Sequence, residues 1–114
     1  MASETIRAVR DSHATRGLIY YDSFGVVVDV SAYAIELVVR HPVSLAVLFE
    51  LAGTSLGTTG KYSFVLTPAH TCFVAGTYPA NIRFWSGGAP AAGTPPSDSK
   101  SCDFILEETV KTLP

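Results

Sequence analysis

Few residues of this chain combine the side-chain types and spacing that catalysis requires. Asp11, Ser12 and His13 include the residue types of a hydrolytic triad, but neighbours in sequence cannot take the positions of orienting carboxylate, nucleophile and base relative to one another. His41 and His70 fall in separate predicted loops, without a second histidine or an acidic residue at metal-ligand spacing. No glycine-rich phosphate loop follows a strand and opens a helix. The sequence therefore predicts no catalytic residue, no metal ligand and no cofactor.

Asp29 and the two cysteines are the remaining residues whose side chains could take part in catalysis or metal binding. Asp29 lies in an apolar run with no second carboxylate placed to face it, so we expect it to cap a turn or accept a backbone N–H. Cys72 and Cys102 do not form a Cys-x-x-Cys pair, which argues against a metal or redox motif. We interpret them as two separate, partly buried thiols. The alternative is one disulfide that ties the last strand to the loop before Gly76.

The aromatic residues would suit a carbohydrate platform, but most of them fall at core-facing strand positions. The set consists of Tyr20, Tyr21, Tyr33, Tyr62 and Trp85. Trp85 is the exception, because it stands at a strand end and out of phase with the core positions. We interpret it as an interface residue.

The composition indicates one domain with a surface poor in charge. A chain of 114 residues can bury a single two-layer core. The net charge is −2 and the eight basic residues are scattered, so the basic stripe that nucleic-acid binding requires is absent. Charged residues make up 16% of the chain, against roughly 25% in typical soluble domains. This deficit predicts association with other copies or other proteins.

Neither a signal peptide nor a membrane span is predicted. The first thirteen residues lack the apolar core of a signal peptide. The longest apolar runs are far shorter than the roughly 18 to 20 residues that cross a bilayer. We therefore expect a soluble chain without a membrane partner.

Alternation of apolar and polar residues predicts strands along most of the chain. In one segment Tyr33, Ile35, Leu37 and Val39 share a face that would lie on the core. The same period of two recurs in residues 61–66, 77–84 and 101–107. Two further short strands, residues 18–21 and 26–30, flank a turn and predict a hairpin.

Residues 44–52 fit two interpretations. As a strand, the segment would place four apolar residues on one side, namely Leu45, Val47, Phe49 and Leu51. As a helix, it would begin near Pro42 and end at Gly53. We prefer the strand because the flanking segments are β-prone, and residues 53–60 then form a hairpin loop.

A corner of the chain is predicted before the strand of residues 77–84. Pro68 permits a short helical turn over residues 69–73, and Gly76 permits a tight turn into the strand. Tyr78 stands where a tyrosine corner would place its ring, with the hydroxyl bonded to backbone a few residues upstream. An immunoglobulin domain with the usual inter-sheet disulfide would carry a cysteine at position 80, which here is Ala80. That disulfide is therefore not expected.

The longest segment without periodicity is SGGAPAAGTPPSDSK, residues 86–100. It is either a tolerated insertion or a contact loop, whose prolines would limit the entropy lost on docking. We expect an N-terminal arm (residues 1–10), a sandwich domain (11–107) and a C-terminal tail (108–114). Such arms commonly become ordered on docking. The interface residues predicted from the loop, the arm and the tail are Trp85, Pro90, Pro95, Pro96, Ile6, Val9, Val110 and Leu113.

Several motifs fit a known pattern: Arg10-Asp11-Ser12, then YYDSFGVVVDVSAYAIELVVR, then KYSFVLTPAHTCFVAGTYPANIRF. They resemble small β-sandwich proteins of tailed bacteriophages, and in particular the N-terminal domain of siphophage upper baseplate proteins. The residues that match directly are Val28, Asp29, Ser31, Tyr33, Arg40, Leu66, Thr67, Thr71, Gly76 and Tyr78. The chain departs from the pattern at Val30 and Ala32, and it lacks a glycine before Asp11.

The resemblance implies an all-β, immunoglobulin-like antiparallel sandwich of about seven strands, with a long Pro/Gly-rich loop before the last strand. Asp29, Tyr33, Gly76 and Tyr78 would define that fold. It also implies a non-enzymatic virion protein, made in the host cytoplasm, that assembles with other virion proteins and with its own copies. A baseplate or tail-fibre adaptor is our first expectation, and a capsid cement or decoration protein is the alternative. A more remote alternative is a glycan-binding surface module that uses Trp85.

Overall fold

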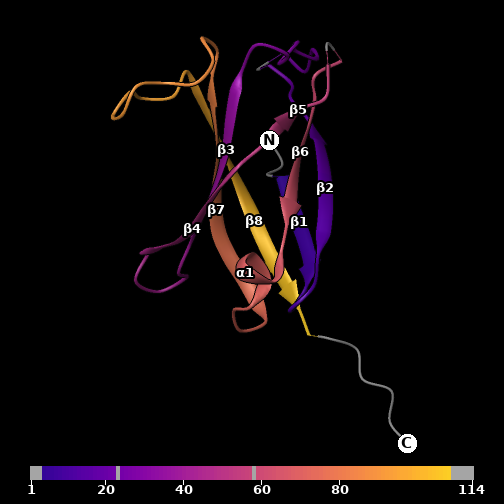
Figure 1. Cartoon of the computed structure of the whole chain (residues 1–114), viewed down its shortest axis with the longest axis vertical. Coiled ribbons are helices and arrows are strands. Elements are labelled where there is room, and N and C mark those ends of the chain that lie inside the picture. Colours follow the sequence, from indigo (N-terminus) through magenta and orange to yellow (C-terminus); the bar gives the residue numbers. More distant parts are fainter. Residues whose placement is uncertain (1–3, 23, 58, 109–114) are drawn as a thin grey trace, which may run out of the picture.

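The computed structural model describes residues 4–22, 24–57 and 59–108, which form two packed β-sheets (Figure 1). The larger sheet has the strand order β1-β8-β7-β3-β4, and the smaller has the order β2-β6-β5. The elements are β1 (Glu4–Val9), β2 (Ala14–Ile19), β3 (Ala34–Arg40), β4 (Val47–Ala52), β5 (Thr54–Ser55), β6 (Lys61–Leu66), α1 (Pro68–Thr71), β7 (Gly76–Trp85) and β8 (Asp98–Glu107). The prediction of an all-β chain with one short helical turn is confirmed.

Aromatic rings fill the space between the sheets. Phe84 of β7 stacks on Tyr20 with ring centroids 4.2 Å apart, and it meets Tyr62 of β6 edge-on at 5.4 Å. Phe64 and Phe104 are fully buried beside them. Burial of each such ring removes roughly 150–250 Å² of side-chain surface from water, so these contacts dominate the packing energy of the core. The core-facing positions predicted in β3, β6, β7 and β8 are confirmed.

Residues 4–9 belong to the sheet, which corrects the expectation of an N-terminal arm. They form β1, which pairs in parallel with β8 and sets Ile6 opposite Phe104. Ile6 is 1% exposed and Ala8 is 2% exposed. Ile6 is therefore a core residue and not an interface residue. The sequence pattern failed here because only two inward positions, one of them a small alanine, mark this short strand.

The predicted strand over residues 26–30 is absent. Val27 makes one isolated bridge to Tyr21, and the strand before it is β2, which ends at Ile19. Val26 and Val27 are 59% and 43% exposed. The predicted hairpin is present only as this antiparallel bridge and two backbone bonds, from the Asp22 N–H to the Val26 carbonyl at 2.9 Å and from the Val28 N–H to the Tyr20 carbonyl at 3.0 Å.

Residues 47–52 form strand β4, so the strand interpretation is confirmed over the helical one. A bulge inserts Leu48 between the paired positions Phe49 and Val47. Phe49 and Leu51 therefore pack against the core, whereas Val47 and Leu45 are 44% and 56% exposed. The expectation that all four apolar residues share one face is wrong, because the extra residue reverses the side-chain phase.

The corner before β7 joins the two sheets. The Tyr78 hydroxyl donates to the Val74 carbonyl, as a tyrosine corner predicts. Thr71, fully buried at the end of α1, donates its hydroxyl to the Ser12 carbonyl at 2.9 Å and accepts the Ser12 N–H at 3.0 Å. Ser12 lies where the chain crosses from β1 in one sheet to β2 in the other. Thr71 therefore holds that crossing in place.

The burial of Ile6 predicts a large loss of stability on truncation. We expect Ile6→Ala to lower the free energy of unfolding by about 2–5 kcal/mol, because it leaves a cavity against Phe104. Urea unfolding followed by circular dichroism measures this change. The neighbouring exposed substitution Arg7→Ala is the matched control and should change stability by about 0.5 kcal/mol or less. Equal stability of Ile6→Ala and the parent chain would show that β1 does not pack as described.

Candidate functional site

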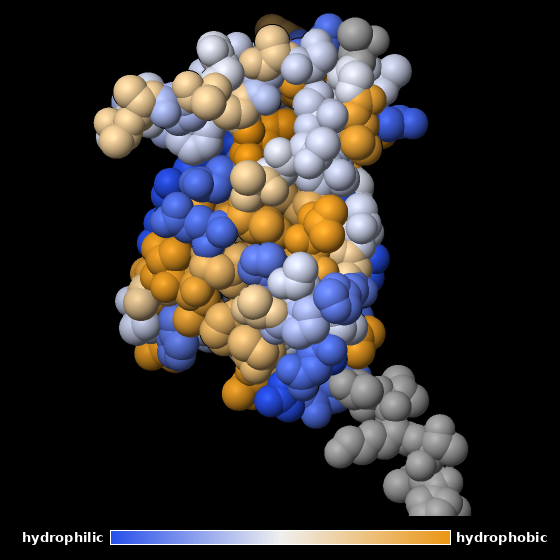
Figure 2. Space-filling model, viewed as in Figure 1, coloured by the Kyte–Doolittle hydropathy of each residue, from blue (hydrophilic) through white to orange (hydrophobic). Residues whose placement is uncertain are grey.

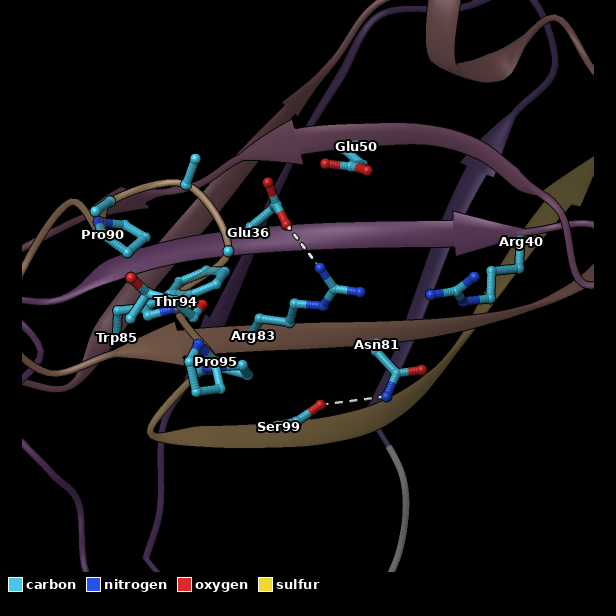
Figure 3. Close-up of a pocket in the computed structure, with 14 residues that line it drawn as sticks. Glu36, Arg40, Glu50, Asn81, Arg83, Trp85, Pro90, Thr94, Pro95 and Ser99 are labelled. Carbon is cyan, nitrogen blue, oxygen red and sulfur yellow. Dashed lines mark hydrogen bonds and ion pairs between the residues drawn. The ribbon is translucent and has the colours of Figure 1, made fainter.

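A groove crosses the outward face of the five-stranded sheet, beneath the loop of residues 86–97 (Figure 3). Its volume is about 900 Å³. The floor consists of outward side chains of β3, β4, β7 and β8, and the loop residues 90–96 line its other side. Because alternate residues of these strands fill the core, the outward positions are the ones left for contact with a partner.

The floor carries both signs of charge. Arg83 of β7 lies opposite Glu36 of β3, with Nη1 and Oε1 3.5 Å apart. Asn81 donates its side-chain amide to the Ser99 hydroxyl at 3.2 Å. Burial and the nearby Glu50 carboxyl raise the pKa of Glu36, and the Arg83 guanidinium opposes them. The floor is therefore a patterned polar surface suited to a partner with complementary charges.

Trp85 supports the loop from below. Its indole N–H donates to the Thr94 carbonyl at 3.0 Å. At the base of the loop, the Ser97 N–H donates to the Phe84 carbonyl at 2.8 Å, and the Ser86 N–H donates to the Ser97 hydroxyl at 3.0 Å. The loop is thus tied to the sheet at its base and near its middle. Because the indole N–H already donates a hydrogen bond within the chain, it is not available to donate one to a glycan.

The structure brings part of the predicted interface set together. Trp85, Pro90, Pro95 and Pro96 all line the groove. The loop itself is shorter than predicted, because β8 already begins at Asp98.

The other predicted interface residues lie elsewhere. Ile6 is in the core, and Val9 is 40% exposed at the end of β1. Val110 and Leu113 lie outside the described residues. The predicted set therefore does not form one surface.

The positions that the resemblance marks as fold-defining have structural contacts. The Asp29 carboxylate accepts the Ser31 N–H at 2.9 Å, which caps a turn as expected and lowers the pKa of Asp29. Tyr33 is half-buried and its ring lies 6.1 Å from that of Tyr20. Gly76 begins β7, two residues before the corner residue Tyr78. These four residues account for local folding and do not line the groove.

A partly buried polar cluster at the start of β8 was not predicted from the sequence. The Tyr20 hydroxyl donates to the Asp98 carboxylate. The Lys100 ammonium lies 3.7 Å from the same carboxylate and 5.2 Å from the centre of the Tyr20 ring. Burial, and next the bond to Asp98, raise the pKa of Tyr20. No sequence signal joins residues 78 positions apart, so only the fold reveals this cluster.

The described part of the chain contains no group of three or more side chains placed to hold a metal ion. Cys72 is exposed, which corrects the expectation of a partly buried thiol there. Cys102 is buried, and no disulfide joins the two residues. Among the same described residues, no helix is long and apolar enough to cross a membrane.

No family model matches the chain, and no curated protein sequence matches it either. Among solved structures, the N-terminal domain of phage TP901-1 ORF48 superimposes with a TM-score of 0.65 at 13% identity, over 93% of this chain and 85% of that chain. A structure from a study of multimeric cell-adhesive interactions of VGSC beta subunits gives a TM-score of 0.46 at 12% identity, over 94% of this chain and 92% of the other. The first likeness shows a shared fold, and the second is too distant to support an argument.

The bond between Trp85 and Thr94 predicts that the indole N–H holds the loop. We expect Trp85→Phe to speed amide hydrogen exchange in residues 86–97, with a loss of overall stability of about 1 kcal/mol or less. Thr94→Ala keeps the accepting backbone carbonyl and is the matched control, which should leave loop exchange unchanged. If Trp85→Phe exchanges like the parent chain, the indole does not hold the loop.

The raised pKa of Tyr20 predicts a loss of stability in alkali. The folded chain holds the phenol proton more tightly than the unfolded chain does, so this stabilisation is complete below the ordinary tyrosine value of 10.0 and is lost as the pH rises above it. We expect Tyr20→Phe to show a shallower fall in stability than the parent chain above about pH 10, measured by urea unfolding at several pH values. Tyr21→Phe, which alters an exposed ring, should keep the parent slope.

Proposed function

We propose that this chain is a non-enzymatic structural protein of a tailed-bacteriophage virion, with an immunoglobulin-like sandwich that serves as a baseplate or tail-fibre adaptor. The observation that carries the proposal is the likeness of 93% of the chain to the N-terminal domain of a phage protein, at a TM-score of 0.65. The motif resemblance, which runs from Arg10 to Phe84, supports the same context independently.

The distribution of roles within the chain also supports the proposal. Residues shared with the phage pattern, such as Thr71 and Tyr78, make contacts inside the domain. The groove is lined mostly by residues that are not direct matches to the phage pattern, such as Arg83, Trp85 and the loop prolines, and Arg40 is the direct match among its lining residues. An adaptor is expected to combine a fold that it shares with other proteins and a binding surface that is particular to it.

The loop-covered groove is the surface that we assign to the virion partner. Residues 86–97 carry no charged side chain and are already tied to the sheet, so little conformational entropy is lost when they dock. The ion pair of Glu36 with Arg83 and the hydrogen bond of Asn81 with Ser99 would set the register and the choice of partner.

The proposal is tested on particles of a phage that encodes this chain. A variant in which residues 88–96 are replaced by a short Gly-Ser turn should fold with the parent circular dichroism spectrum but be lost from purified particles. Val65→Ser is the matched control, because Val65 is 53% exposed on β6, away from the groove. It should be incorporated like the parent chain.

The location of the chain in the particle separates the two virion roles. An adaptor co-purifies with tails that lack heads, and this is the result that we expect. A cement protein instead adds to preformed capsids in three- or six-fold register. Recovery on heads alone would replace our assignment with capsid decoration, and absence from all particles would reject both.

A further inference from the structure

The segment between β2 and β3 and the helix α1 lie at opposite ends of the domain (Figure 1). The first carries the exposed side chain of Phe24, and an apolar pocket is formed by residues that follow α1 and by the β3–β4 side. We propose that copies of this chain associate head to tail, with Phe24 of one copy seated in the α1-side pocket of the next. This inference goes beyond the proposed function and stands without it, because it rests on the surface of the isolated chain.

Phe24 is held outward by a closed turn. Its side chain is 89% exposed, the highest exposure among the large apolar residues that the structure describes. The Asp22 carboxylate accepts the N–H of Phe24 at 2.8 Å and that of Val26 at 3.0 Å. The Asp22 N–H donates to the Val26 carbonyl at 2.9 Å, and Gly25 adopts a left-handed φ of 79° that its lack of a Cβ permits. The ring is therefore presented in a conformation that needs little further ordering on binding.

The receiving pocket has a volume of about 320 Å³ and is lined largely by apolar atoms. Leu48 of the β4 bulge, Phe73 and Val74 supply much of that lining. This is enough space for a benzyl group. The chemistry of the pocket matches an aromatic side chain better than a charged or strongly polar one.

Exposed apolar residues extend the pocket on the side of the β3–β4 hairpin. Val43 and Val74 are 85% and 73% exposed, and Leu45 is 56% exposed. Figure 2 shows apolar side chains gathered over the β4 side of this face, toward the end that carries α1. Solvent-exposed apolar residues that cluster in this way mark interaction surfaces.

The hairpin beside the pocket stores backbone strain. Leu45 has a left-handed φ of 62°, which costs energy for a residue with a side chain. The Leu45 N–H donates to the His41 carbonyl at 3.0 Å, and the His41 N–H donates to the Ala46 carbonyl at 2.8 Å. These bonds fix the hairpin in a shape that keeps its apolar side chains in water. Such a shape gains stability when a second surface covers it.

Complementary chemistry and placement favour a second copy as the occupant. The same chain carries the outward aromatic side chain of Phe24 and an apolar pocket of about 320 Å³. Because the two features lie at opposite ends, one copy can use both at once. The contact is heterologous and builds a ring, or a chain where the rotation does not close.

Self-association of the purified full chain tests this inference by sedimentation equilibrium. We expect the parent chain to associate in a concentration-dependent way. Phe24→Ser and Val74→Asp should each weaken association roughly 30-fold or more, as loss of a central interface contact does. Both substitutions alter side chains more than 70% exposed, at 89% and 73%, so both variants should fold. Val65→Ser, which removes an apolar side chain that is 53% exposed and lies outside both features, should associate like the parent.

Mixing the two variants separates this contact from other modes of association. Phe24→Ser retains an intact pocket and Val74→Asp retains an intact Phe24, so an equimolar mixture should form a 1:1 heterodimer that grows no further. A parent chain that stays monomeric at millimolar concentration would overturn the inference. So would a Phe24→Ser variant that associates like the parent, or a mixture no more associated than either variant alone. None of these results depends on whether the chain is found in a virion.

Discussion

The crossing of the chain between the two sheets is the constraint on which the rest of the domain depends. β1 and β2 are consecutive but lie in different sheets, and only residues 10–13 join them. The fully buried Thr71 hydroxyl both donates to and accepts from Ser12, and the Asp11 N–H donates to the Thr71 carbonyl at 3.0 Å. Because the buried hydroxyl has both a donor and an acceptor as partners, no desolvation penalty offsets the free energy of its hydrogen bonds. With the crossing held, β1 covers the β8 edge, the aromatic rings meet between the sheets, and the outward face of β7 and β3 is left for the groove.

The parts of the fold that depend on local spacing could be predicted from the sequence. Alternation placed the inward residues of β3, β6, β7 and β8 correctly, and the Tyr78 corner joins atoms only four residues apart. The failures share a physical cause, since each depends on a distant partner. β1 is a strand because β8 lies beside it nearly one hundred residues later, and the β4 phase changes because the pairing with β3 skips Leu48.

The candidate site was predicted only in part for the same reason. Trp85 and the loop prolines stood out by composition, and the structure places them together. The floor did not stand out, because Glu36 and Arg83 look like ordinary solvated positions on two separate strands. They become a pair only through the adjacency of β3 and β7, which period-two alternation does not specify. Phe24 was likewise hidden, since a phenylalanine next to a valine run looks like a core residue until the turn at Asp22 is known.

The bulge in β4 affects how the edge of the larger sheet can pair with a neighbouring molecule. β4 lies at one end of the strand order of the larger sheet, and within the described residues no further strand pairs with its outer side. An open, regular edge is a template on which the sheet of a neighbouring molecule can continue. The extra residue Leu48 interrupts the repeat of that edge, and the left-handed Leu45 turns the chain just before it. The bulge therefore works against continuation of the larger sheet at its β4 edge, where a neighbouring molecule would otherwise find a regular row of backbone groups.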